Sequence, residues 1–204
     1  MKFKKFSALV VFVVSLSGCI SPKTYVDPSF SKANYNDIQP VSEKYETQIM
    51  VEFQRNGEPF ERANKEVRGH VERTLRATGV ITPSLEESRI SVKVIVNNVG
   101  DMSEAVAKGF GTGITFGAAG SLVTDYYEIT IEFTDSTGTK LTENYKHALH
   151  TTIGNKDAPF NSVEATTPAD GFGTVVEQTL LNFIKDMQAK GLLTLDTHGL
   201  GKFS

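Results

Sequence analysis

The segment Tyr126-Tyr127-Glu128-Ile129-Thr130-Ile131-Glu132-Phe133-Thr134 decides the fold class of this chain. Its apolar and polar residues alternate, which is the two-residue period of a strand with one buried face. The residues expected to face the core are Tyr127, Ile129, Ile131 and Phe133. The turn sequence Asp135-Ser136-Thr137-Gly138 follows, and an extended pattern resumes over residues 140–152. We therefore predict two antiparallel strands joined by a tight turn.

A strand, a helix and a second strand precede this pair. Residues 47–54 alternate like a strand, and Asn56-Gly57 predicts a turn after them. A helix should then run from Pro59 to Gly79, because one helical face collects the residues Phe60, Asn64, Val67, Val71 and Leu75. Residues 89–96 alternate again. The helical crossover between the two strands predicts that they pair in parallel, with right-handed connectivity.

A last helix is expected from about residue 172 to 190, with Gly191 as its cap. Its apolar stripe consists of Val175, Val176, Leu180, Phe183, Ile184 and Met187. The order β-α-β-β-β-α predicts an α+β fold, with a four-stranded, mostly antiparallel sheet and two helices packed on one face. We expect residues 47–204 to form this single domain, which includes a glycine-rich segment at 106–124.

The first 18 residues have the features of a targeting segment. Lys2, Lys4 and Lys5 precede the uncharged run 8–16, which is far shorter than the roughly 20 residues of a membrane-spanning helix. The sequence Leu16-Ser17-Gly18-Cys19 then resembles the bacterial lipobox, in which a branched apolar residue and two small residues precede a cysteine. The alternative is an ordinary secretory signal followed by a fortuitous cysteine.

The lipobox resemblance implies cleavage between Gly18 and Cys19, a diacylglyceryl group on the Cys19 thiol, and acylation of the new amine, commonly with palmitate. Several acyl chains anchor a protein stably, whereas one chain binds only marginally. Ile20 follows the cysteine, where an aspartate would resemble an inner-membrane retention signal. The expected location is therefore the outer membrane, facing the periplasm, with exposure at the cell surface as the alternative.

Residues 19–46 are predicted to be the lipidated cysteine and a flexible tether, because this stretch is polar and contains Pro22, Pro28 and Pro40. Aromatic residues recur in it at five-residue spacing, as Tyr25, Phe30 and Tyr35. We favour packing of these rings on the domain over a strip that binds a partner.

Charge and cysteine content exclude several classes of function. The formal net charge is −3, and residues 1–18 carry three lysines and no acid, so the remaining 186 residues carry −6. An acidic domain is a poor match for nucleic acid. Cys19 is the only cysteine, so a disulfide or a thiolate metal site within the domain is not expected.

The glycine-rich segment 106–124 is the unusual part of the sequence. Glycines 109, 111, 113, 117 and 120 alternate with apolar residues, but no third glycine completes a dinucleotide-binding loop, and no lysine stands where a phosphate loop needs one. Two readings remain open: a connection that packs over the end of the sheet, or an apolar segment that contacts a membrane, a lipid or a second copy. The candidate contact residues are Phe110, Ile114, Phe116, Leu122 and Val123.

Other polar residues give no catalytic motif. His147 and His150 should lie on opposite faces of a strand, which prevents them from sharing a metal ion. We read His70, His198 and the acidic pairs Glu86-Glu87 and Asp101/Glu104 as solvated. Ser121 lacks the Gly-x-Ser-x-Gly context of a nucleophile. We therefore expect no catalytic residue, no cofactor and no metal.

The lipobox, the sheet-and-helix pattern, and the stretch Gly113-Ile114-Thr115-Phe116-Gly117 leading into Asp125-Tyr126-Tyr127-Glu128-Ile129 resemble small Gram-negative envelope lipoproteins. Those families often have a glycine-rich turn, a tyrosine-bearing strand pair and a closing helix. They have no agreed catalytic residues, and this chain lacks the proline that ends their turn. The resemblance implies an interaction or accessory module of an envelope complex, with an envelope protein or a second copy as its partner. A lipid or small-ligand carrier is the alternative, and a hydrolytic enzyme is the third possibility.

Overall fold

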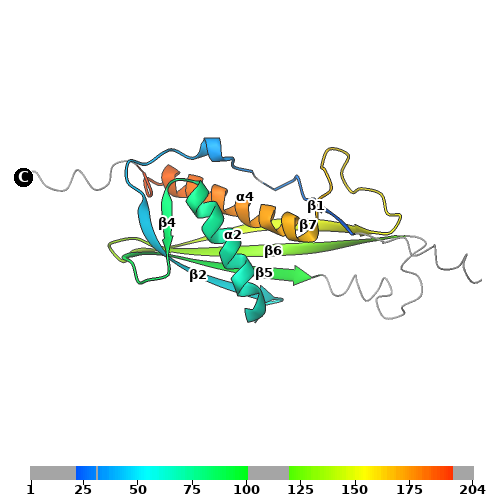
Figure 1. The fold of residues 1–204 in the computed structure, drawn as a ribbon, viewed down its shortest axis with the longest axis horizontal. Coiled ribbons are helices and arrows are strands. Elements are labelled where there is room, and N and C mark those ends of the chain that lie inside the picture. The colour runs from blue at the N-terminus through cyan, green and yellow to red at the C-terminus, as the bar shows by residue number, and fades with distance from the viewer. Residues whose placement is uncertain (1–21, 31, 101–119, 195–204) are drawn as a thin grey trace, which may run out of the picture.

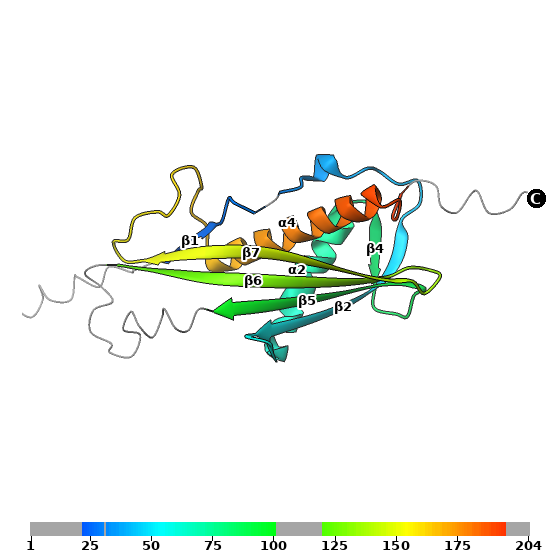
Figure 2. The same cartoon turned by 180° about the vertical axis from the view of Figure 1, so that it is seen from behind.

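The computed structural model describes residues 22–30, 32–100 and 120–194. A long, twisted sheet forms one layer, and two helices, α2 (Asn64–Ala77) and α4 (Pro168–Ala189), cover the same face of it (Figures 1 and 2). The α+β class and the placement of both helices on one face agree with the prediction. No helix in the described part of the chain is long and apolar enough to cross a membrane.

The sheet has seven strands in the order β1-β7-β6-β5-β2-β3, and β4 also pairs with β2. The strands are β1 (Lys23–Val26), β2 (Tyr45–Arg55), β3 (Glu58–Pro59), β4 (Ile81–Ser84), β5 (Ile90–Gly100), β6 (Ser121–Thr134) and β7 (Lys140–Ile153). As predicted, β2 and β5 are parallel and β6 and β7 form an antiparallel hairpin. The prediction of a four-stranded, mostly antiparallel sheet is wrong, because β4 also joins β2 in parallel and β1 and β3 extend the two edges.

The helices differ from the predicted ones at their first turns. Pro59 lies in edge strand β3 rather than at a helix start, which suits a residue without an N–H donor. A 3-10 turn, η3 (Glu61–Ala63), then leads into α2. Helix α4 starts at Pro168, because the Thr167 hydroxyl accepts a hydrogen bond from Asp170 N and caps the first turn.

The core lies between the two helices and the inward face of the sheet. All four residues that we assigned to the inward face of 126–134 are at most 7% exposed, as are Val92, Val94 and Val96 of β5. Phe183 of α4 is fully buried and packs on Phe133, with ring centroids 6.3 Å apart. The alternating pattern of the long strands therefore predicted the buried face correctly.

Residues 22–46 do not form the flexible tether that we expected. Strand β1 pairs with β7, a short 3-10 helix, η2 (Tyr35–Asp37), follows, and Ala33 and Ile38 are buried in the core. The three prolines lie outside β1 and η2, so they do not interrupt either element. Tyr25 is 6% exposed and the Phe30 ring stacks on His147, which fits packing of these rings on the domain.

No helix within residues 22–30, 32–100 and 120–194 covers the opposite face of the sheet along β2, β5, β6 and β7 (Figure 2). This open face carries Met50 and Tyr126, which are 37% and 46% exposed. Ion pairs lie among them, with Lys93 Nζ 3.0 Å from Glu52 Oε2 and Lys146 Nζ 3.6 Å from Glu128 Oε1. The open face is therefore mainly polar, with isolated large apolar side chains.

Candidate functional site at the end of the sheet that holds the N-terminal strand

Strand β1 is fixed on both of its sides. On one side it pairs with β7, from Lys23 opposite Thr152 to Val26 opposite Leu149. On the other side Thr24 and Thr166 exchange two backbone hydrogen bonds, of 2.9 and 2.8 Å. Thr24 is fully buried. The strand that follows the predicted lipidation site is thus built into the sheet rather than resting on its surface.

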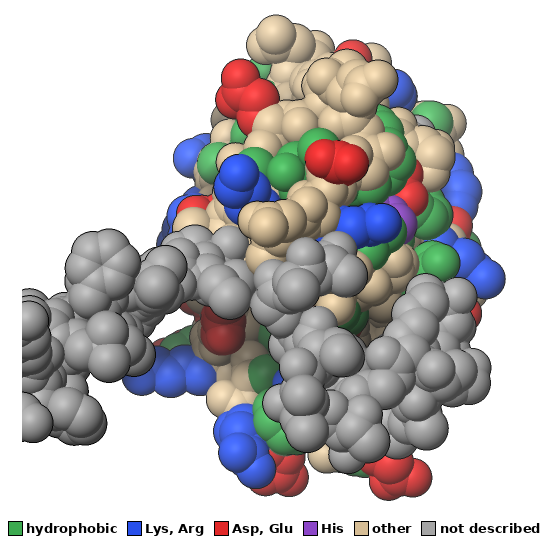
Figure 3. All heavy atoms as spheres, turned by 90° about the vertical axis from the view of Figure 1, so that its right-hand side faces the viewer, with side chains coloured by type: hydrophobic (Ala, Val, Ile, Leu, Met, Phe, Trp, Pro, Cys, Tyr) green, Lys and Arg blue, Asp and Glu red, His purple; other side chains and the backbone are tan. Residues whose placement is uncertain are grey.

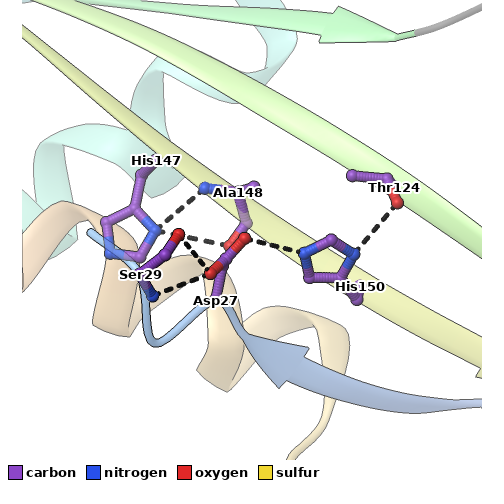
Figure 4. A network of polar contacts seen from close by, with 6 residues as sticks. All are labelled: Asp27, Ser29, Thr124, His147, Ala148 and His150. Carbon is purple, nitrogen blue, oxygen red and sulfur yellow. Dashed lines mark hydrogen bonds and ion pairs between the residues drawn. The ribbon is translucent and has the colours of Figure 1, made fainter. Parts of the chain in front are cut away.

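A chain of polar contacts joins β1, β7 and β6 (Figure 4). His150 Nε2 lies 3.0 Å from Asp27 Oδ2, just beyond β1, and His150 Nδ1 lies 3.0 Å from the Thr124 hydroxyl of β6. Asp27 N also donates to the Ala148 carbonyl. The His150 and Asp27 side chains are only 14% and 15% exposed. The cluster of Asp27, His150 and Thr124, called the three-strand clamp below, therefore fastens the start of the chain to the central hairpin.

The Asp27 carboxyl group has a lowered pKa. Burial alone would raise this pKa, but hydrogen bonds from Ser29 and His150 outweigh that effect. The Ser29 N–H and hydroxyl both donate to Oδ1, at 2.8 and 2.7 Å. Asp27 is therefore a carboxylate at neutral pH and accepts a hydrogen bond from His150 Nε2–H, while His150 Nδ1 shares a hydrogen bond with the Thr124 hydroxyl.

This hydroxyl–imidazole–carboxylate order is also the order of groups in hydrolytic triads. Here strand pairing fixes Thr124 on β6 and His150 on β7, and the hydrogen bond from Asp27 N to the Ala148 carbonyl holds Asp27 directly after β1. The two contacts among these residues each join neighbouring segments of the sheet, which is a structural role. Sequence reasoning missed the clamp, because its members are at positions 27, 124 and 150 and share no local spacing.

His147 lies on the other face of β7, toward the helices. Its Nε2 lies 2.7 Å from Gln178 Oε1 of α4, and its Nδ1 accepts from Ala148 N at 2.9 Å. Burial lowers the His147 pKa, which keeps the ring neutral. The prediction that His147 and His150 face opposite sides is confirmed. Among the described residues, no group of three or more His, Cys, Asp or Glu side chains is placed to hold a metal ion.

Two glycines permit close approaches at this end of the sheet. Gly120 has φ +68°, and a Cβ there would lie 2.4 Å from the backbone nitrogen of Lys156. A Cβ on Gly171, in the first turn of α4, would lie 3.0 Å from Thr24 Cγ2. The chain entering β6 therefore needs a residue without a side chain at Gly120, whereas Gly171 allows the start of α4 to pack tightly against the Thr24 methyl group of β1.

Several of the predicted site residues lie elsewhere or cannot be placed. Leu122 and Val123 are half-buried near the start of β6. Gly18, Cys19, Phe110, Ile114 and Phe116 lie outside the described residues, as do Asp101, Glu104 and His198. Glu86 and Glu87 are exposed, as expected. His70, which we read as solvated, is half-buried with its ring against Phe172 and its Nδ1 2.6 Å from Arg73 Nη2.

Comparisons with known proteins give likenesses of fold only. No family model matches the chain, and no curated protein matches it. Among solved structures it is similar to a PelC dodecamer variant from Paraburkholderia phytofirmans (TM-score 0.37, 14% identity, 70% of this chain and 88% of that chain). It is also similar to a minor lipoprotein from Acinetobacter baumannii (TM-score 0.36, 11% identity, 72% of this chain and 93% of that chain). A third similar structure is that of a putative neuraminyllactose-binding hemagglutinin homolog from Helicobacter pylori (TM-score 0.44, 9% identity, 80% of this chain and 90% of that chain). Likenesses at this level do not identify a function or a partner.

Proposed function

We propose that this chain is a lipid-anchored protein of the bacterial cell envelope, held at the outer membrane through Cys19, whose α+β domain contacts another envelope protein. The anchor rests on Leu16-Ser17-Gly18-Cys19 and on the charged and apolar residues before it. The structure adds that an ordered strand, β1, begins at Lys23, so the domain starts almost directly after the proposed anchor.

The observation that carries the interaction role is the open face of the sheet. Tyr126 stands exposed on it between the Lys146–Glu128 ion pair and the start of β6, and Met50 is exposed on β2. Protein interfaces are enriched in tyrosine and methionine within a polar surround, which is the composition of this face. An envelope protein with a matching polar surface and an apolar recess for Tyr126 is the partner that this face suits.

Lipidation is tested by replacing the proposed acceptor. In cells given an alkyne analogue of palmitate, the wild-type chain should become labelled and should sediment with outer membranes. Cys19→Ala should lose the label and the membrane association, whereas Ser17→Ala, which keeps a small residue before the cleavage site, should retain both. Membrane association of Cys19→Ala equal to that of the wild type would contradict the anchor.

The interaction role is tested with a photo-crosslinking residue at Tyr126 in intact cells. The matched control position is Lys65, which is exposed on α2, on the side of the domain that the helices cover. We expect one envelope protein, or a second copy of this chain, to be captured through position 126 and not through position 65. Equal capture from both positions, or none from position 126, would refute the proposal for this face.

A further inference from the structure

We infer that the end of the sheet where β1 begins lies against the headgroups of the membrane that holds the Cys19 lipid, and that the long axis of the sheet points away from that membrane. This inference rests on the lipidation proposed above and goes beyond it, because it names the surface that meets the bilayer. This surface, called the proximal end below, consists of Lys23, Gly120, Ile153, Asn155 and Lys156.

The length of chain before β1 limits the distance to the membrane. Pro22 is the first described residue of the N-terminal segment, and Cys19 lies three residues before it. Three Cα–Cα steps span at most about 11 Å, whatever their conformation. A lipid on Cys19 therefore holds Pro22 within about that distance of the headgroup region, which leaves no room for the domain to stand off.

The position of β1 in the sheet then decides which part of the domain lies close to the membrane. Lys23 pairs with Thr152, and Thr152 pairs with Leu122, so the start of β1 lies beside the end of β7 and the start of β6. The backbone of Lys156 closes over Gly120 at the same place. Because β1 is held by pairing on both sides and by the three-strand clamp, it cannot swing away from this end without loss of those contacts.

The opposite end of the sheet, called the distal end, carries the turn at residues 135–138 between β6 and β7. The exposed Leu85 directly follows β4, whose end lies at the same height as the start of β5 and the end of β6. Strand β6 has 14 residues, so it separates the two ends by about 45 Å. Because the tether is short and joins the domain at one end of this long sheet, it favours an upright domain.

The proximal end has two exposed lysines, Lys23 and Lys156, among the five residues that define it, and Figure 3, which looks onto this end, shows basic, acidic and apolar side chains intermixed. The covalent tether acts whether or not these lysines attract anionic headgroups, and salt does not screen a covalent link. We therefore expect the orientation to persist at high salt.

The test uses the full lipidated protein in liposomes that contain a minority of anionic lipid and a lipid with a nitroxide headgroup. Cys19 is the only cysteine and its thiol carries the lipid, so Asn155→Cys and Ser136→Cys each supply one free thiol for a fluorophore. Both positions are exposed, one at the proximal end and one at the distal turn. We expect the nitroxide lipid to quench the probe at position 155 several-fold more than the probe at 136, at low and at high salt.

A tether variant tests the cause of this difference. A 20-residue Gly/Ser linker inserted before Pro22 has a root-mean-square length of about 25 Å. The quenching at position 155 should then fall to nearly the level at 136. Retained quenching in the linker variant would overturn the inference.

Flotation of the labelled protein with the liposomes is measured separately. Failure to float contradicts the lipid anchor itself, whereas flotation with equal quenching at 155 and 136 refutes only the orientation.

Discussion

Replacing Gly120 by alanine should destabilise the domain far more than the same change at Gly138. Both glycines have positive φ, +68° and +87°, and this conformation costs a residue with a Cβ about 1–2 kcal/mol. Nothing lies within 4 Å of a Cβ at Gly138. A Cβ at Gly120 would lie 2.4 Å from Lys156 N and 3.0 Å from the Asn155 carbonyl carbon, so backbone must move.

Such overpacking typically adds about 1–3 kcal/mol. We therefore expect Gly120→Ala to lower the free energy of unfolding by about 2–5 kcal/mol, and Gly138→Ala by about 1–2 kcal/mol. Urea unfolding of the chain without residues 1–19 measures both values, and hydrogen exchange should locate the movement at 153–157. Equal losses from the two substitutions would refute the close approach of residues 155–156 to the start of β6.

Three further predictions concern polar groups. His150→Ala leaves the partners of the three-strand clamp unpaired, so it should cost about 1–3 kcal/mol and speed hydrogen exchange of the β1 amides; unchanged exchange there would contradict the clamp. Burial holds the His147 pKa below its unfolded value of about 6.5, so the unfolded chain takes up a proton first as the pH falls. The contribution of neutral His147 to the free energy of unfolding should be fully present above about pH 6.5 and should be lost as the pH falls toward the lowered pKa. His147→Gln should therefore flatten this part of the profile of unfolding free energy against pH. The Gln188 side-chain amide accepts a hydrogen bond from Gln39 N and donates to the Gln39 and Leu193 carbonyls. Gln188→Glu should therefore lose both donated bonds and lower the free energy of unfolding by about 2 kcal/mol or more at pH 7. An unchanged free energy of unfolding in a urea titration would count against this assignment.

Three of the long strands could be predicted from sequence because each of them repeats the alternation several times. Strands β2 and β5 have 11 residues each and β6 has 14, so apolar residues at alternate positions define their buried face over much of their length. Strand β7 lacks this pattern, because Glu143 and His147 stand among its inward positions, and it followed instead from the turn after β6. The parallel pairing of β2 and β5 also followed, because a helix connects them. These four strands and two helices form most of the core.

The edge strands could not be predicted in the same way. Strands β1 and β4 have four residues each and β3 has two, which is too short for an alternating pattern to stand out. Pro59 and Pro83 lie in β3 and β4, where proline is tolerated at an edge but usually indicates a turn or a helix start. These short strands exist because β2 and β7 offer unpaired edges, which is a tertiary effect rather than a local preference.

The three-strand clamp could not be predicted from the sequence either, because its three residues are far apart in the chain. His150 stands near His147 in the sequence, whereas its contacts are Asp27 and Thr124, which are 123 and 26 residues away. Thr124 could be paired with His150 once the hairpin register was known. Asp27 could not, because its position depends on β1, which was expected to be part of a tether.

The location of β1 therefore changes what the N-terminal sequence means. Proline and polar content suggested a spacer that would free the domain from its anchor, but the pairing of Thr24 with Thr166 and of Asp27 with His150 makes this segment part of the fold. For a lipid on Cys19, any force on the anchor then acts on the edge of the sheet within a few residues. Shifting β1 by one residue would also turn Thr24 out of its buried site, so register and anchoring are coupled. With the proposed lipid on Cys19, the end of the domain that faces the membrane is thus set by the pairing of one four-residue strand rather than by a linker.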